Sequence, residues 1–480
     1  MQLISQIANI ASFNGLDEFW QRALQSSVIV KIGGALKSAL SKIDGETVRK
    51  LGSLCQSLSF AIALIWFAAL ALPMFKDDKD VLAIIGLGGF ALWILGYLFG
   101  GKESRRASAT DMLVLIFFAT NVVAAAASHY FMPAVLGLLK IIVYICSYFF
   151  LTAVLQNSPK RKLALVSVLV LAAVVESLVG FEQFRNHVQP LATWEDPTVE
   201  TQGTRIFSWL GNPNLLAGYL IPVGPLAFAL GFSALTSKKW LLAIPPLIAG
   251  AIISVAIVLT GSRGGYLAIG AAAATISLMA VARFWIAKPK ARVFIVILCV
   301  VLPILLVLGL HFVPSFEQRL TSIFAGREHS SNSYRINVWN ASWRMFLDNW
   351  WIGIGPGNKV FRLAYGLYMV SGYDALGTYC VPLEVAVECG VVGLITFGLL
   401  LVSLFARAHI SFWSVNADKS TGLSLEQWLT AGAVAALVGL LAQGMVDTVF
   451  YRPQVQYIFW LAVALIVTDM RGSSSIKQNS

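Results

Sequence analysis

The segment from Thr260 to Gly265 combines three features that favour the binding of an anion. Arg263 is a permanent cation, and its guanidinium can donate two parallel hydrogen bonds to a carboxylate, a bicarbonate or a phosphate. Gly264 and Gly265 let a ligand approach the backbone, and a helix that begins here offers unpaired amides and partial positive charge. The sequence therefore predicts an anion site at Arg263, with an arginine that only anchors a loop as the alternative.

Four further ionisable residues lie in or beside long apolar stretches, where a charge is costly and usually functional. Lys140 and Glu176 lie inside two such stretches, and we predict that they line a path for a small anion. The alternatives are that the two residues pair with each other, or that the lysine extends to the membrane surface. Glu384 and Glu388 are four residues apart on one face of a predicted helix, so they are candidates for a general base or a cation site, with salt bridges to Arg263, Arg335 or Arg452 as the alternative.

Polar residues also precede other apolar stretches on the predicted outer face. Asn212 and Asn214 flank Pro213, and Asn214 is predicted to cap the helix that follows. Asp447 and Arg452 lie close together between the last two stretches, and we predict that they form a local pair. All four are also candidate contributors to the Arg263 site, because all are predicted to face outward.

These residues are positioned by a membrane protein. The chain of 480 residues is 58% hydrophobic and only 12% charged, with a mean hydropathy of +0.75. A helix needs about 20 apolar residues to cross a hydrocarbon core of about 30 Å. The sequence therefore predicts an all-α, polytopic membrane protein with about 12 transmembrane helices, at 55–73, 81–99, 111–128, 132–155, 163–181, 215–235, 240–260, 264–287, 293–313, 381–406, 428–449 and 455–470.

The basic residues predict the orientation. Most of the 35 lysines and arginines lie in the N-terminal segment and in alternate short loops. By the positive-inside rule both termini are cytoplasmic, and we expect this multi-pass chain in the inner (plasma) membrane, with the thylakoid membrane as the alternative. The net charge of +11 therefore reports topology, and we predict no nucleic-acid partner. The units are a cytoplasmic tail at 1–54, helices at 55–313, an extracytoplasmic loop at 314–380, helices at 381–470 and a cytoplasmic tail at 471–480.

The large loop is predicted to be an ordered extracytoplasmic cap. Residues 333–346 read as a short amphipathic helix, and the glycines and proline of 353–358 predict a turn. The five cysteines and five histidines show no spacing typical of a metal site, so we predict neither a metal nor another cofactor.

Several motifs together resemble the O-antigen ligase-like superfamily. They are the order of the apolar stretches, Ser262-Arg-Gly-Gly265, a large loop that opens with Arg335 and Trp339, and Gly355-Pro-Gly357 followed by a Pro-Leu-Glu helix. Three longer stretches, 211–218, 379–388 and 447–454, resemble its cyanobacterial branch named for bicarbonate transport. The resemblance extends from about residue 50 to residue 470.

The superfamily resemblance implies an inverting, metal-independent transfer of a glycan from a lipid pyrophosphate to an acceptor hydroxyl, with Arg263 and Arg335 on the pyrophosphate. Ligases of this group have a histidine just before the helix that follows the large loop, and residues 375–382 contain none. We therefore favour transport or accumulation of inorganic carbon, with bicarbonate and membrane lipid as partners and the two arginines as the entry site. The alternative is an extracytoplasmic glycan ligase or polymerase acting on a lipid-linked glycan, so whether the chain is an enzyme depends on which hypothesis holds.

Overall fold

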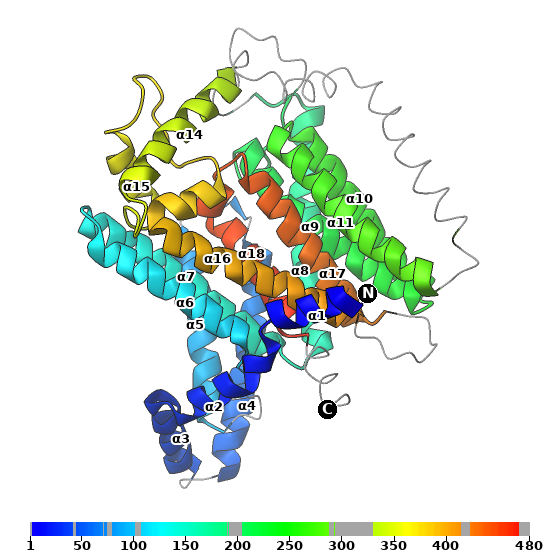
Figure 1. Cartoon of the computed structure of the whole chain (residues 1–480). Helices are drawn as coiled ribbons and strands as arrows, with labels where there is room; N and C mark the ends of the chain where they lie inside the picture. Colours follow the sequence, from blue (N-terminus) through cyan, green and yellow to red (C-terminus); the bar gives the residue numbers. More distant parts are fainter. Residues whose placement is uncertain are drawn as a thin grey trace.

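The computed structural model describes residues 2–41, 45–70, 72–73, 79–100, 107–189, 191, 204–287, 292, 330–413 and 423–469. Within these residues all regular elements are helices, and no strand is present (Figure 1). The predicted all-α, polytopic membrane fold is confirmed. Ten helices are long and apolar enough to cross a membrane, namely α4 (Gly45–Ala69), α5 (Lys79–Leu98), α6 (Ala109–Ala127), α7 (Phe131–Leu155), α8 (Pro159–Arg185), α9 (Pro213–Thr236), α10 (Trp240–Leu259), α11 (Arg263–Ala287), α16 (Val381–Trp413) and α17 (Leu425–Gly444).

These ten helices overlap ten of the predicted stretches. The largest difference is at α4, which begins at Gly45 because polar turns extend the helix beyond its apolar part. The predicted stretch 293–313 lies outside the described residues. The last stretch corresponds to α18 (Pro453–Val467), whose 15 residues span about 22 Å at 1.5 Å per residue, too short to cross a membrane alone.

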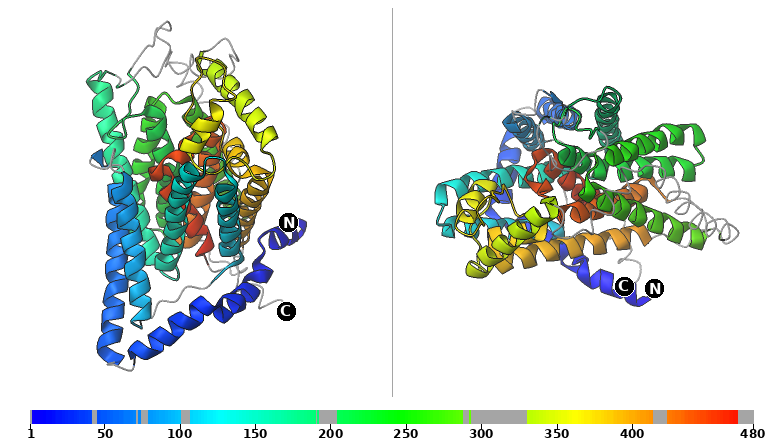
Figure 2. Two further views of the ribbon diagram at one scale, coloured as in Figure 1. Left: turned by 90° about the vertical axis from the view of Figure 1, so that its left-hand side faces the viewer. Right: turned by 90° about the horizontal axis from the view of Figure 1, so that it is seen from above.

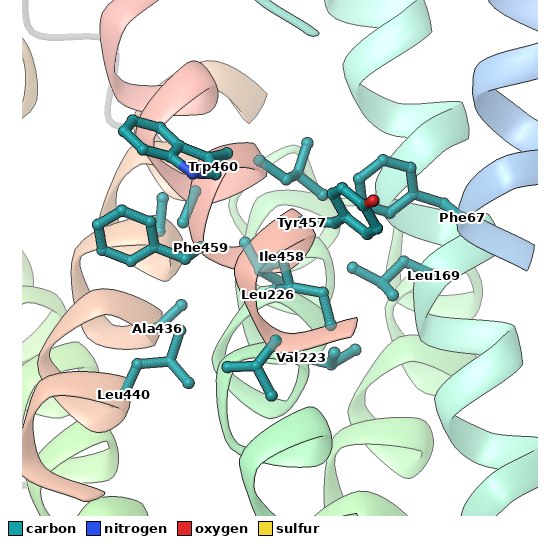
Figure 3. Packing of buried hydrophobic residues seen from close by; sticks show 14 of the residues in the cluster. Phe67, Leu169, Val223, Leu226, Ala436, Leu440, Tyr457, Ile458, Phe459 and Trp460 are labelled. Atoms are coloured by element: carbon teal, nitrogen blue, oxygen red, sulfur yellow. The ribbon is translucent and has the colours of Figure 1, made fainter. Parts of the chain in front are cut away.

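The position of α18 at the centre of the bundle explains why it can be short. Almost every residue from Gln454 to Ile466 is buried, so protein rather than lipid surrounds this helix. A helix enclosed in this way does not have to match the thickness of the bilayer. Its side chains fill the spaces between neighbouring helices: in Figure 3, Tyr457 lies near Phe67 of α4 and Leu169 of α8, and Phe459 lies on the side of Ala436 and Leu440 of α17.

The N-terminal segment is helical and is fastened to the bundle. It comprises α1 (Gln2–Ala11), which packs against α16, then α2 (Asp17–Ser26) and α3 (Val28–Ser41) (Figure 2). Asp17 makes the main polar contact, because its Oδ1 accepts hydrogen bonds from the Ala109 amide at the start of α6 (2.7 Å) and from Arg407 near the end of α16 (2.5 Å). One carboxylate thus joins the N-terminal segment to two transmembrane helices.

Replacing Asp17 with alanine is expected to lower the Tm of the detergent-solubilised protein by several degrees. The change removes the acceptor from a helix N-terminus and from a largely buried guanidinium, and such unpaired groups cost about 1–3 kcal/mol. The matched control is Glu18→Gln, because Glu18 forms an exposed ion pair with Arg22 that contributes little. Equal Tm values for the two variants would contradict the prediction.

A cap covers the end of the bundle where α16 begins. The cap, residues 330–380, contains α14 (Ser330–Asp348) and α15 (Asn358–Tyr365), and it lies at the opposite end from α2 and α3 (Figure 2). It has its own apolar core, in which Val338 and Met345 of α14 pack with Phe361 and Tyr365 of α15. The predicted helix at 333–346 and the predicted turn at 353–358 are both present.

The cap is attached to a break in α16. The backbone of Gly390 is left-handed (φ 66°, ψ −167°), so the helix hydrogen bonds are interrupted there. The cap turn replaces them: the Ile354 amide donates to the Val387 carbonyl (2.9 Å) and the Gly355 amide donates to the Glu388 carbonyl (3.0 Å). Broken transmembrane helices are tolerated where protein satisfies the freed groups. No pattern in the sequence predicted this break.

Candidate functional site

Arg263 is the first residue of α11 and extends to the cap. Its NH1 donates a hydrogen bond to Asn332 Oδ1 of α14 (3.2 Å). The start of α11 is also capped locally, because the Ser262 hydroxyl accepts from the Gly265 amide (3.2 Å). The predicted anion-site arginine therefore lies where a transmembrane helix meets the first turn of α14.

The two glycines after Arg263 serve helix packing, and the prediction that they admit a ligand to the backbone is wrong. A Cβ on Gly264 would lie 2.9 Å from the side chain of Val446. A Cβ on Gly265 would lie 3.2 Å from the Cβ of Ala217. Both places are filled by neighbouring helices or their ends, so the glycines allow α11 to approach them closely.

Arg335 lies on α14 one turn after Asn332, the partner of Arg263. Its NH1 donates to Ser331 Oγ (3.0 Å), and its buried Nε has no hydrogen-bond partner in the described part of the chain. Residues three apart on a helix face the same way, so α14 presents Asn332 and Arg335 together. The structure therefore brings the two predicted arginines to adjoining turns of α11 and α14.

A buried carboxylate, Asp447, lies beside this pair. Asp447 is 8% exposed, and its Oδ1 accepts a hydrogen bond from the Thr448 amide (2.8 Å). Burial raises the pKa of Asp447 above its ordinary value, while the charges of Arg335, Arg452 and Arg205 act on it in the opposite direction. Three arginines therefore act on the charge of Asp447, and Arg335 acts on it more strongly than its predicted partner Arg452 does.

Arg205 was not among the predicted site residues. Its Nε donates to the Thr260 carbonyl (2.9 Å), and its NH2 donates to Asn214 Oδ1 (3.2 Å). These two bonds bring the guanidinium from the connection before α9 to the segment that carries Arg263. Its position just before the 211–218 stretch is the sequence feature that could have identified it as a site residue.

The N-cap of α9 is Asn212, and not Asn214 as predicted. Asn212 is the N-cap of α9, since its Oδ1 accepts from the amides of Asn214 (2.9 Å) and Leu215 (3.2 Å). The prediction that Asn214 caps the helix is wrong, because Pro213 occupies the first helical position, where an amide hydrogen is not needed. Asn214 instead orients Arg205, which makes it an indirect contributor to the arginine cluster.

Tyr379 occupies part of the stretch in which the ligase histidine is absent. Its backbone carbonyl accepts from Trp339 Nε1 (3.3 Å), and its ring packs edge-on against Tyr334 at 5.6 Å between centroids. Burial raises the pKa of Tyr379, and the charges of Asp447 and Arg335 also act on its hydroxyl. Tyr379 is therefore a neutral hydrogen-bonding group close to the same cluster.

The predicted membrane residues divide between two places. Lys140, Glu384 and Glu388 line one cavity of about 120 Å³ between α6, α7, α16 and the start of α18. Glu176 does not line that cavity; its backbone carbonyl accepts from the Ser208 hydroxyl (2.8 Å) in the connection before α9. The Oε1 of Glu388 accepts from the Tyr451 hydroxyl (2.8 Å), and the Gly357 amide also acts on this carboxylate, whereas no arginine in the described part of the chain pairs with it.

Residues 248–398 match the family model described as O-antigen ligase. The match supports the predicted resemblance to the O-antigen ligase-like superfamily. No curated protein matches the chain. The ligase-like segment extends from α10 into α16 and includes Arg263, Arg335, Glu384 and Glu388, whereas Asp447 lies beyond it.

Proposed function

We propose that this multi-pass membrane protein transfers a glycan from a lipid-linked pyrophosphate to an acceptor hydroxyl. The observation that supports this best is the buried Asp447 beside Arg335, Arg452 and Arg205, with Arg263 on the adjoining turn. Guanidiniums bind pyrophosphate oxygens in pairs, and a cation cluster stabilises the charge that builds up on a departing pyrophosphate. The partners are then a lipid-linked glycan and the surrounding membrane lipid, which the ligase-like match also favours.

In the proposed reaction the acceptor oxygen attacks the anomeric carbon of the glycan, on the side opposite the pyrophosphate. The new carbon–oxygen bond forms as the bond from that carbon to the phosphate oxygen breaks, so the configuration inverts. The lipid pyrophosphate leaves with the bonding electrons and stays on Arg263 and Arg335. The proton of the acceptor hydroxyl passes to Asp447, which replaces the absent histidine as the general base.

Glu384 and Glu388 were the sequence-based candidates for the base, and the outer cluster favours Asp447 over them. Glu388 accepts a hydrogen bond from Tyr451 near the break in α16. Arg335, one of the two arginines that would bind pyrophosphate, acts on the charge of Asp447, and among the described residues no arginine acts on these glutamates. Tyr379 remains a neutral neighbour that can donate a hydrogen bond to the acceptor or to the pyrophosphate.

Replacing Arg335 with alanine tests the proposal. Transfer from an extracted lipid-linked glycan by the reconstituted protein is expected to fall by about 100- to 1,000-fold, as when one group that stabilises transition-state charge is lost. Binding of farnesyl pyrophosphate, a probe for the leaving group, is expected to weaken in parallel. Arg344→Ala is the matched control, because Arg344 lies on the exposed side of the same helix. The proposal would be overturned if wild type catalysed transfer and Arg335→Ala catalysed it at the same rate.

Bicarbonate transport, for which the resembled cyanobacterial branch is named, is the second candidate. One observation favours it, namely that the cation Lys140 lines a cavity between transmembrane helices, whereas the two carboxylates in the same wall would repel an anion. The test is uptake of labelled bicarbonate into proteoliposomes by wild type, Arg263→Ala and Lys140→Leu. Uptake that is lost in both variants would establish transport, and no uptake by the folded, inserted wild type would reject it.

A further inference from the structure

The cavity between α6, α7, α16 and α18 is separate from the arginine cluster and has no role in the proposed transfer. It measures about 120 Å³, and a water molecule needs roughly 10–15 Å³ of such space, so several water-sized groups fit. Aromatic side chains form much of its wall, including Phe117, Tyr144 and Trp460. Its polar lining residues come from several elements, including Asn121 of α6, Lys140 of α7 and Gln456 of α18, and its carboxylates come from α16.

Two carboxylates of α16 line this cavity. Glu384 is 6% exposed and Glu388 is 9% exposed, and their charges act on each other. Glu388 Oε1 accepts a hydrogen bond from the Tyr451 hydroxyl (2.8 Å). Glu384 Oε2 is buried and has no hydrogen-bond partner among the described residues. An unpartnered carboxylate oxygen in a cavity at membrane depth is costly, so it indicates a missing positive partner.

Lys140 does not supply that partner. Its charge acts on Glu388 across the cavity, but no ion pair within 4.0 Å joins it to either glutamate. Two carboxylates and one lysine leave an excess of one negative charge in the wall when all three are ionised. A single added positive charge would balance it.

We propose that the cavity binds one monovalent metal cation of the sodium class, with Glu384 Oε2 as its principal ligand. Hard cations prefer oxygen ligands, and the hydroxyl of Tyr451 and a carboxylate oxygen of Glu388 lie on the same wall. The remaining space holds water that completes the coordination. The balance of one charge favours a monovalent over a divalent ion.

The proposed cation acts on the attachment of the cap. The Glu388 carbonyl accepts from the Gly355 amide of the cap turn (3.0 Å), and the Gly357 amide lies close enough to act on the Glu388 carboxylate. A cation that neutralises Glu384 and Glu388 removes their mutual repulsion in this short segment of α16. Sodium therefore stabilises the cap on the bundle without touching the arginines or Asp447, whether or not the chain is a transferase.

The test compares sodium chloride with N-methylglucamine chloride at equal ionic strength, on the full-length protein in detergent. For wild type we expect Tm to rise saturably with sodium and ²²Na⁺ to bind at one ion per chain. Glu384→Gln is expected to abolish both effects. Glu176→Gln is the matched control, because Glu176 is also a buried carboxylate in a transmembrane helix with an unpartnered oxygen, but lies outside the cavity.

Two results would overturn the proposal. One is a sodium-dependent rise in Tm that is the same in Glu384→Gln as in wild type, which would place the ion elsewhere. The other is that sodium does not change the Tm of wild type, while Glu384→Gln has a higher Tm whichever cation is present. This result would mean that a proton neutralises Glu384 and Glu388. If Glu384→Gln does not fold, ²²Na⁺ binding to folded wild type decides, because the proposal requires one saturable ion per chain and the absence of such binding overturns it.

Discussion

Replacing Asp447 with asparagine is expected to lower glycan transfer by about 100- to 10,000-fold, the usual contribution of a positioned general base. Asparagine has the same shape and can still accept the Thr448 amide hydrogen, but it cannot take the proton of the acceptor hydroxyl. Binding of farnesyl pyrophosphate is expected to be unchanged or tighter, because the nearby arginines lose a competing negative charge. A loss of transfer with retained binding separates a base from a binding residue.

The pH dependence gives a second readout of the same role. The base must be ionised to act, so transfer falls as the pH drops through its pKa. Because burial raises the pKa of Asp447 above its ordinary value of about 3.9, the acid limb is expected at higher pH than for an exposed aspartate. In Asp447→Asn the residual transfer is expected to lose this limb.

The stability of Asp447→Asn is the necessary control, and its sign follows from the same shift. A raised pKa in the folded state means that the native protein binds this proton more tightly than the unfolded chain does. The ionised carboxylate therefore disfavours folding at neutral pH, and the stability linked to the proton is lost as pH rises through the folded-state pKa. A neutral asparagine is expected to leave Tm at pH 7 unchanged or higher.

The matched variant is Asp374→Asn in the cap. Asp374 forms an exposed pair with Arg362 at 3.5 Å and is not among the charges that act on Asp447, so the transfer rate of Asp374→Asn is expected to equal that of wild type. Near-normal transfer by Asp447→Asn would show that another group takes the proton. Glu384→Gln and Glu388→Gln would then be the next variants to assay.

The transmembrane helices were predictable because hydropathy alone determines which segments enter the bilayer. The exception is instructive: α18 has the composition of a span but only 15 residues, and its length reflects its enclosure by other helices. Nothing in the sequence of 453–467 distinguishes an enclosed helix from one that faces lipid. The same holds for the break at Gly390, since it depends on a cap turn that precedes it by some thirty residues.

The site was predictable in part. Arg263 and Arg335 could be singled out because each combines a charge with a recognisable local pattern, and the structure places them on adjoining turns. The group at the centre of the cluster, Asp447, and its neighbour Arg205 come from connections far apart in the chain. Their proximity depends on how α9, α11 and α17 pack. Arg452 was predicted as the partner of Asp447 because the two residues are close in the sequence.

Replacing Gly390 with alanine is expected to detach the cap and to lower Tm more than any other substitution considered. The backbone of Gly390 (φ 66°, ψ −167°) has a conformation that essentially only glycine adopts, and it costs a residue with a Cβ about 1–3 kcal/mol. The larger cost is steric, because that Cβ would lie 2.2 Å from the carbonyl oxygen of Trp351 in the cap. Backbone atoms on both sides cannot move apart without breaking the bond from the Val391 amide to the Trp350 carbonyl (2.7 Å).

The control is Gly398→Ala, in the same helix two turns later. A Cβ at Gly398 meets no atom within 4 Å, and alanine is the better helix former, so Tm is expected to stay the same or to rise slightly. Limited proteolysis then distinguishes detachment from general unfolding, since cleavage is expected to begin within 330–380 in Gly390→Ala while the bundle stays intact. Identical Tm and cleavage in the two variants would mean that α16 can straighten without cost. The cap turn would then not be what holds the break open, and the cap would be held by its contacts with α7 and α11 instead.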